Sequence, residues 1–371
     1  MNTARRTRIL IVDDSVVMRS LLRSAIYADT GLEVAGSAAD GESALRTIET
    51  FHPDLILLDV EMPVMDGLAT LRELRARGDK TPVIMCSSLT RRGARVTIEA
   101  LAAGASDYVA KPAGQTSREA ALETLAQDLI PKIHAIVSQA QPQPPLFGGP
   151  RAPNLAHLAP QPISSNPTVL AIGVSTGGPA ALDDFLPALP AEFPLPVLIV
   201  QHMPELFTRL FAERLDSRCR LRVREVAEGD PVCAGTVSIA RGNWHMEVLA
   251  ALLAGSSPTL HLNQDPPENH CRPAVDALFR SVAAVYGAGA LAVVLTGMGS
   301  DGLIGCRAVR DHGGSVLIQD QATSTVWGMP GAVAHAGLAH KVLPLDGLVP
   351  EILRLASRRH SEAREVLKSA V

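Results

Sequence analysis

The sequence predicts two α/β domains joined by a linker, and three features of the chain support this fold class. Short apolar runs end at turn residues, and segments with apolar pairs on one helix face separate them. Alternating strands and helices of this kind are typical of a mainly parallel sheet covered on both faces. Residues 141–167 contain eight prolines in 27 positions, which excludes a regular helix or central strand and indicates an extended linker.

The first half of the chain contains four continuous apolar runs that predict buried strands. They are "RILIVDD" (8–14), "DLILLDV" (54–60), "PVIMCSS" (82–88) and "DYVAKP" (107–112). Helical patterns separate them, including apolar pairs spaced four apart between Val17 and Ile26 and the segment 67–78. A last helix is expected over 117–140, directly before the linker.

The second half repeats this organisation with different sequences. Buried strands are expected in "TVLAIGV" (168–174), "LPVLIVQ" (195–201), "ALAVVLTG" (290–297) and "GSVLIQD" (314–320). The segment 229–248 alternates apolar and polar residues between turn signals, which favours a β-hairpin insertion. We therefore expect a doubly wound, mainly parallel α/β sheet with a hairpin inserted into it.

Composition excludes several classes of protein. A net charge of -4 and 3% aromatic residues over 371 positions give no reason to expect nucleic acid as a partner. The five cysteines lie far apart without a CxxC pair, which indicates free thiols in a reducing compartment. The apolar run after the first residues is too short for a signal peptide, and no run reaches membrane-spanning length. A cytoplasmic protein without a transmembrane segment is expected.

Polar side chains stand where the predicted strands of the first half end: Asp13, Asp14, Asp59, Ser87 and Lys111. Since parallel strands share one carboxyl edge, we expect these side chains to converge. Converging carboxylates repel one another unless a hard cation lies between them, and Mg²⁺ suits oxygen ligands of this kind. Lys111 and Ser87 could then hold phosphoryl oxygens, which makes Asp59 the natural phosphoryl acceptor. Any one of these acids alone would more often be a cap or turn residue.

These motifs resemble the response-regulator receiver domain over residues 5–125. The resemblance implies a flavodoxin-like (βα)5 fold, phosphorylation of Asp59 and a histidine kinase as phosphodonor. It further implies Mg²⁺ held by Asp13, Asp14, Asp59 and the backbone carbonyl of Glu61. Ser87 and Lys111 match the hydroxyl and lysine positions of the family, and Tyr108 matches its switch aromatic.

A serine stands at a glycine-rich corner in the second half, in "TVLAIGVSTGGPAAL" (168–182). "GVSTG" satisfies the G-x-S-x-G pattern, in which a strand-to-helix turn exposes the serine beside backbone N–H groups. A phosphate-binding loop is disfavoured, because the glycine spacing is not G-x-G-x-x-G and no P-loop lysine follows. Ser175 is therefore either a nucleophile or ordinary turn material.

Two further strand ends supply partners for such a nucleophile. His202 directly follows the strand predicted at 195–201, and Asp301 lies in the glycine-rich loop after 290–297. Together with Ser175 they could form a nucleophile, a base and a group that orients the base. Alone, His202 could be a packing residue and Asp301 a turn residue. Rival bases are His245, His270, His312 and His335.

The motifs "IGVSTGGPAAL", "VQHMP", "CRPAVDALFRSVA", "VVLTGMGSDG" and "STVWGMPGAV" resemble the catalytic domain of the chemotaxis protein-glutamate methylesterases, the CheB family. The resemblance implies Ser175 as nucleophile, His202 as base and Asp301 as third member of a catalytic triad. Candidate oxyanion donors are the backbone amides of Thr176, Gly177 and Met298. Arg241 departs from the family, which more often has proline there.

The resemblance implies a receiver at 5–125, its last helix and a linker at 126–166, and a methylesterase domain at 167–358. It implies a phosphorylation-activated serine esterase that hydrolyses glutamate 5-methyl esters, and deamidates glutamines, on methyl-accepting chemoreceptors, with no metal needed for the hydrolysis. A receiver-controlled noncatalytic signalling adaptor is the alternative. A transcription factor is disfavoured because the second half lacks a helix-turn-helix pattern and a basic face.

Overall fold

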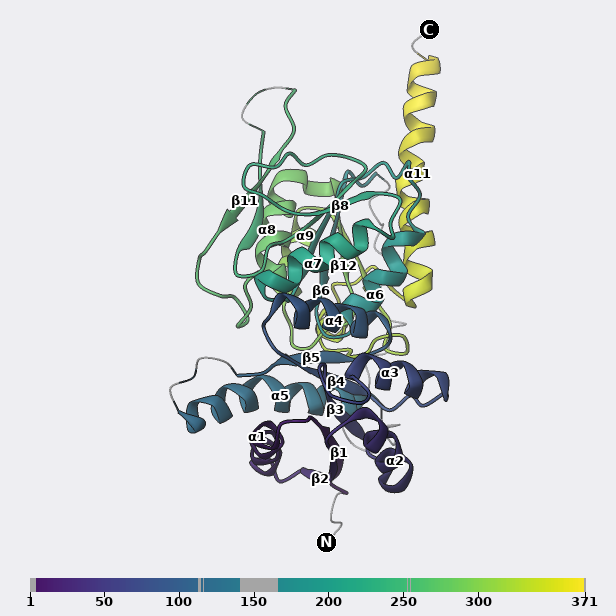
Figure 1. Ribbon diagram of the computed structural model, residues 1–371. Helices are drawn as coiled ribbons and strands as arrows, with labels where there is room; N and C mark the ends of the chain where they lie inside the picture. The colour runs from purple at the N-terminus through teal and green to yellow at the C-terminus, as the bar shows by residue number, and fades with distance from the viewer. Residues whose placement is uncertain are drawn as a thin grey trace, which may run out of the picture. The chain divides into compact units, whose positions relative to one another are not determined.

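The computed structural model describes residues 5–112, 115, 117–140, 166–251, 253 and 255–369 (Figure 1). Most of the predicted linker, residues 141–165, lies outside the described residues. The chain divides into two compact units, Met1–Pro144 and Pro145–Val371. Each unit is built around its own parallel sheet.

The first unit has a five-stranded parallel sheet in the order β2-β1-β3-β4-β5. Its strands are β1 (Thr7–Val12), β2 (Leu32–Ala38), β3 (Leu55–Asp59), β4 (Val83–Ser87) and β5 (Asp107–Ala110). Its helices are α1 (Val16–Tyr27), α2 (Gly41–Phe51), α3 (Gly67–Ala76), α4 (Arg91–Ala102) and α5 (Arg118–Ala140). Helices α1 and α5 pack together, while α3 contacts α2 and α4, so helices cover both faces of the sheet (Figure 1).

The second unit has a seven-stranded sheet in the order β14-β13-β12-β6-β7-β9-β8, in which every neighbouring pair is parallel. Its strands are β6 (Val169–Val174), β7 (Val197–Gln201), β8 (Arg222–Glu225), β9 (Thr236–Ile239), β12 (Ala290–Val294), β13 (Ser315–Gln319) and β14 (Lys341–Leu343). Strands β6, β7, β12 and β13 are buried along their whole length, which explains their continuous apolar sequences.

Helices flank this sheet, with α8 and α9 on one side and α6 and α11 on the other (Figure 1). The helices are α6 (Gly178–Phe185), α7 (Glu205–Asp216), α8 (Val275–Tyr286), α9 (Leu303–Asp311), α10 (Met329–His335) and α11 (Leu345–Ser369), with short 3₁₀ helices η2 (Leu186–Ala188) and η3 (Gly287–Gly289). Within the described residues, no helix combines the length and apolar character that crossing a bilayer requires.

The β-hairpin insertion is present, but it begins later than the predicted segment. Strand β10 (His245–Leu249) pairs antiparallel with β11 (Thr259–Asn263). The first part of the predicted hairpin, β9, instead joins the main sheet between β7 and β8. Alternation alone could not separate these outcomes, because β9 and a hairpin strand present the same short run between turns.

Candidate active site and phosphoacceptor site

Three strand ends meet at the carboxyl edge of the first sheet. Asp13 follows β1, Asp59 ends β3 and Lys111 follows β5. Lys111 Nζ lies 2.7 Å from Asp13 Oδ2 and 2.7 Å from Asp59 Oδ1. Both acids are buried, so the ammonium group of the partly exposed Lys111 bridges two buried carboxylates.

The charges of this group shift one another's pKa values. Burial raises the pKa of Asp59 above its ordinary value, and the neighbouring Lys111 only partly offsets this effect. Burial lowers the pKa of Lys111, but its hydrogen bonds and attraction to Asp13 and Asp59 outweigh burial, so that its pKa is raised overall. Lys111 is therefore a fixed positive charge beside Asp59.

The acids also fit a divalent cation. Asp13, Asp14 and Asp59 each offer a carboxylate oxygen, and these oxygens all lie within 4.8 Å of one another. Hard carboxylate oxygens with an exposed member, Asp14, suit Mg²⁺, which keeps several of its waters. The Glu61 N–H points to Asp59 Oδ1 at 3.4 Å, and the role of the Glu61 carbonyl stays a prediction.

Of the three predicted switch residues, Ser87 and Tyr108 are buried and Lys111 is partly exposed. The Ser87 hydroxyl accepts a hydrogen bond from Thr97 Oγ1 at 2.7 Å and donates to the Ser88 carbonyl at 3.2 Å. Tyr108 is 7% exposed, and Lys132 Nζ lies 5.3 Å from its ring centroid while donating to its carbonyl at 2.7 Å. Burial raises the pKa of Tyr108 well above its ordinary value.

In the second unit, the strand register brings Ser175 and His202 to the same level of the sheet. Val174 pairs with Gln201 across β6 and β7, and Ser175 and His202 follow these residues directly. The Ser175 N–H donates to the Thr296 carbonyl at 3.0 Å. Gly177, with a φ of 78°, then turns the chain into α6, which is the strand-to-helix corner that the sequence predicts.

Gln201, for which the sequence pattern predicts no role, connects the backbone at Ser175 and His202. Its Nε2 donates to the Ser175 carbonyl at 3.1 Å and to the His202 carbonyl at 3.4 Å. The Gln201 side chain is buried, and a Cβ on Gly178 would lie 2.1 Å from Gln201 Oε1. Gly178 is therefore required for the close approach of α6 to Gln201.

His202 and Asp301 form a buried pair. His202 Nε2 lies 2.8 Å from Asp301 Oδ2, and their side chains are 13% and 2% exposed. The Ser175 hydroxyl makes no hydrogen bond among the described residues, and His202 Nδ1 instead lies 3.5 Å from Cys271 Sγ. Because Asp301 occupies Nε2, Nδ1 is the nitrogen that remains for Ser175, and the structure does not show a hydrogen bond between these two side chains.

Asp301 also caps a helix that it does not belong to. Its Oδ2 accepts from the Val275 N–H at 2.7 Å, and its Oδ1 accepts from the Asp276 N–H at 3.0 Å, both at the start of α8. Asp276 in α8 does the same for α9, because its Oδ1 accepts from the Gly305 N–H in the first turn of α9 at 2.6 Å. Each acid satisfies N–H groups at the positive end of the other helix.

This setting fixes the charges of the pair. Burial favours a neutral Asp301, but His202 and the backbone donors prevail and lower its pKa below the ordinary value. Burial likewise lowers the pKa of His202, but hydrogen bonds with Asp301 and Cys271 and their charges raise it overall to about 9. The pair is thus strongly coupled, with Asp301 as the anion.

The candidate oxyanion donors lie around the serine corner. Thr176 and Gly177 directly follow Ser175, and a Cβ on Gly297 would lie 2.9 Å from Ser175 Cβ, which puts the segment before Met298 against the serine. The N–H groups of Gly177 and Met298 donate to no acceptor among the described residues. These groups could therefore serve an oxyanion.

The rival histidines are engaged elsewhere. His245 is buried between the Ala274 N–H, at 3.2 Å, and the Pro266 carbonyl, at 3.3 Å. His312 and His335 each contact a carbonyl of their own helix, and His270 is exposed on a turn. Of these four, none pairs with a carboxylate among the described residues.

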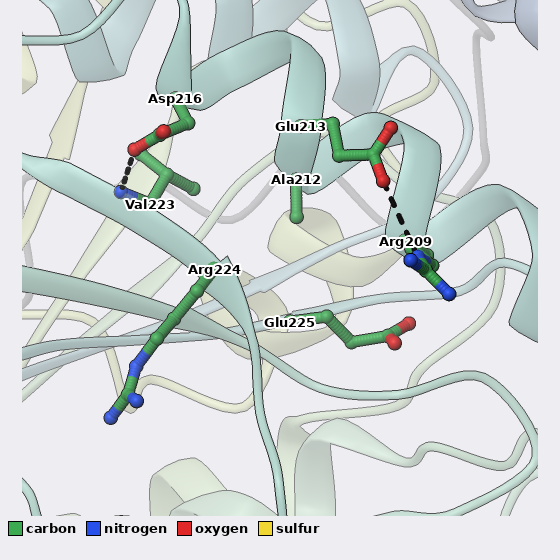
Figure 2. Close-up of a pocket in the computed structure, with 7 residues that line it drawn as sticks. All are labelled: Arg209, Ala212, Glu213, Asp216, Val223, Arg224 and Glu225. Atoms are coloured by element: carbon green, nitrogen blue, oxygen red, sulfur yellow. Dashed lines mark hydrogen bonds and ion pairs between the residues drawn. The ribbon is translucent and has the colours of Figure 1, made fainter.

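Arg241 forms part of a cavity wall beside the start of α7. Its Nε donates to Glu205 Oε1 at 3.0 Å, and its guanidinium lies 5.6 Å from the Trp244 ring centroid. The cavity, of about 540 Å³, is lined by Glu205, Leu206, Arg209, Glu225 and Arg241. A neighbouring pocket of about 320 Å³ between α7 and β8 is shown in Figure 2, where Arg209 pairs with Glu213. Neither cavity contains Ser175, His202 or Asp301.

Comparison with known proteins agrees with these features. The family model described as CheB methylesterase matches residues 170–352, and the response regulator receiver domain matches residues 9–123. A relative from Nocardioides, named protein-glutamate methylesterase/protein-glutamine glutaminase, is 50% identical over 355 residues, which covers 95% of this chain and 96% of the relative. A relative of the same name from Trichodesmium erythraeum is 47% identical, covering 94% of this chain and 98% of the relative.

Among solved structures, the CheB methylesterase catalytic domain of Thermotoga maritima is 39% identical, covers 51% of this chain and 99% of its own, and has a TM-score of 0.49. The identity and coverage of the curated relatives decide the assignment, because they extend over both units. The chain therefore belongs to the CheB methylesterase family, with a response regulator receiver domain before the methylesterase domain.

Proposed function

We propose that this chain is a phosphorylation-activated serine esterase that hydrolyses glutamate 5-methyl esters, and deamidates glutamines, on methyl-accepting chemoreceptors. The observation that carries the proposal is the buried His202–Asp301 pair, 2.8 Å apart, at the sheet edge where Ser175 also stands. The names of the curated relatives supply the substrate class, a protein glutamate ester and a protein glutamine.

The first half of the reaction forms an acyl-enzyme. Ser175 Oγ attacks the ester carbonyl carbon while His202 Nδ1 takes the hydroxyl proton, and Asp301 stabilises the imidazolium. The negative charge on the carbonyl oxygen is met by the N–H groups of Gly177 and Met298. The carbon–oxygen bond to methoxide then breaks, and Nδ1 returns its proton so that methanol leaves.

The second half releases the product. A water molecule gives a proton to His202 Nδ1 and attacks the acyl carbon, after which Ser175 leaves with that proton and a glutamate carboxyl group remains. A glutamine side chain passes through the same intermediate, with ammonia in place of methanol. None of these steps requires a metal.

The receiver supplies control in this proposal. Asp59 is the phosphoryl acceptor, Asp13, Asp14 and Asp59 would hold Mg²⁺, and a histidine kinase is the phosphodonor. When bound, Mg²⁺ neutralises charge on the phosphoryl oxygens. Lys111, already 2.7 Å from Asp59, would hold one of these oxygens. The added charge of roughly two negative units would reorganise the face that carries Ser87 and Tyr108 and relieve inhibition of the esterase.

The proposal is tested by methanol release from methylated chemoreceptor membranes. Wild-type protein should release methanol, and Ser175→Ala should lower the rate by several powers of ten, because the nucleophile is lost while oxyanion donors and binding remain. Full activity of the variant would exclude Ser175 as nucleophile. Inactivity of the wild-type protein toward every methylated receptor would instead favour the noncatalytic adaptor.

A further inference from the structure

A tight turn between β11 and α8 lies against the His202–Asp301 pair. Asn269 and His270 have positive φ angles of 50° and 63°. Glu268 and Cys271, on either side of them, exchange two backbone hydrogen bonds of 3.1 and 2.8 Å. Two residues of positive φ closed in this way form a type I′ turn, for which asparagine is a preferred first central residue.

The turn is anchored to α8 by an ion pair. Arg280 Nη1 and Nη2 donate to the two carboxylate oxygens of Glu268 at 2.8 and 2.6 Å. A bidentate pair of this kind fixes direction as well as distance. The turn therefore keeps its place relative to the first residues of α8, which Asp301 caps.

From this turn, the Asn269 side chain bridges two buried acids. Its Nδ2 donates to Asp301 Oδ1 at 3.1 Å and to Asp276 Oδ2 at 3.0 Å. The acids are 2% and 1% exposed, and an amide nitrogen carries two hydrogens, so it can serve both at once. Without this donor, two neighbouring buried carboxyl groups would lose a shared partner, and their repulsion would favour protonation of one of them.

We propose that Asn269 is a positioning residue for ester hydrolysis, which holds the Asp301 carboxylate in the orientation that presents Oδ2 to His202 Nε2. The amide donates to Oδ1 together with the Asp276 and Gly302 N–H groups, while Oδ2 is the oxygen that contacts the histidine. Asn269 thus acts through Asp301, because its side-chain hydrogen bonds among the described residues go to the two acids. This inference rests on the proposed function, since it assumes that His202 and Asp301 serve the esterase reaction.

The test compares two glycine substitutions in the same turn. Asn269→Gly removes the amide, while glycine tolerates the positive φ of that position. His270→Gly makes the same backbone change at a neighbour whose side chain has no hydrogen bond among the described residues. In Asn269→Gly, kcat for methanol release should fall about tenfold with KM unchanged, whereas His270→Gly should retain wild-type kcat.

Asn269→Asp provides a second variant, since aspartate keeps the volume and tolerates the turn. It replaces the shared donor by a third carboxyl group, so kcat should again fall, while thermal unfolding monitors whether each variant is folded. Unchanged kcat in folded Asn269→Gly or Asn269→Asp, beside an active wild-type protein, would overturn the inference alone. A wild-type protein that releases no methanol would overturn the proposed function together with it.

Discussion

His202 should make ester hydrolysis depend on pH. Its pKa is raised to about 9 from an ordinary value of 6.5, and only the neutral ring can accept the Ser175 proton. The rate constant kcat should therefore rise with pH and level off above about pH 9. This rise is measured as kcat against pH with saturating methylated receptor. A kcat that stays constant between about pH 6.5 and 9 would contradict the assignment of His202 as base.

The same raised pKa affects stability, with the opposite direction. A histidine that is more basic in the folded state binds its proton more tightly there than in the unfolded chain. Its contribution to the free energy of unfolding is therefore fully present below about pH 6.5 and is lost as the pH rises through about 9. Optimal catalysis and the full stabilisation from this group thus occur at different pH values.

Cys271 makes the base sensitive to thiol reagents. Its Sγ lies 3.5 Å from His202 Nδ1, so an adduct on sulfur would crowd the nitrogen that is proposed to accept the Ser175 proton. Alkylation with iodoacetamide should therefore block methanol release. Cys271→Ser should remain active after the same treatment, even though the exposed Cys233 can still react. Loss of activity in treated Cys271→Ser protein would show that another cysteine is responsible.

The corner between β6 and α6 tolerates only glycine at position 177. Gly177 has a φ of 78°, and a Cβ there would lie 2.3 Å from Thr325 Oγ1. Gly177→Ala should therefore lower the free energy of unfolding by about 2 kcal/mol or more and reduce kcat, since strain and a clash add together. Denaturant unfolding and methanol release measure both effects.

Gly229→Ala is a matched control for this substitution. Gly229 has the same φ of 78°, but a Cβ there would meet nothing within 4 Å. It should cost only the backbone strain, about 1 kcal/mol. Equal losses of stability in the two variants would exclude the clash with Thr325 as a cause.

The strands that the sequence predicts have short, continuous apolar sequences that are mostly buried, such as β3 and β6. Strands β2, β8 and β14 lie at sheet edges, are partly exposed and have less apolar sequences, so the apolar pattern does not predict them. Strand β9 was assigned to the hairpin instead of the main sheet. Edge and neighbouring strands depend on what they pair with, which a single-chain pattern does not encode.

The candidate site divides in the same way. Residues at strand ends, such as Asp59, Lys111, Ser175 and His202, were predictable because parallel strands deliver their carboxyl ends to one edge. The sequence pattern predicts no role for Gln201, although it directly precedes His202. Asn269 gave no signal, since its role depends on a type I′ turn and on two acids that lie 7 and 32 positions further along the chain.

The whole chain should respond to a phosphoryl mimic through Asp59. Beryllofluoride with Mg²⁺ should increase methanol release by the full-length protein, because it supplies acceptor oxygens and charge at the carboxylate next to Lys111. Asp59→Asn should abolish the increase while leaving the basal rate unchanged. An equal rate with and without the mimic in wild-type protein would contradict control by the receiver.

Asp301 has a structural role besides its proposed catalytic one, because it caps the start of α8. This role matters for the choice of an inactive variant in inhibitor or trapping studies. Replacing Asp301 removes the anion beside His202 and also the acceptor of three backbone N–H groups. An inactive Asp301 variant would therefore combine the loss of catalysis with a loss of stability. A substitution of Ser175 is better suited to produce an inactive but folded variant that still binds a methylated receptor. For the same reason, we expect a homologue that has lost esterase activity to retain an acid at position 301, because the starts of α8 and α9 depend on it.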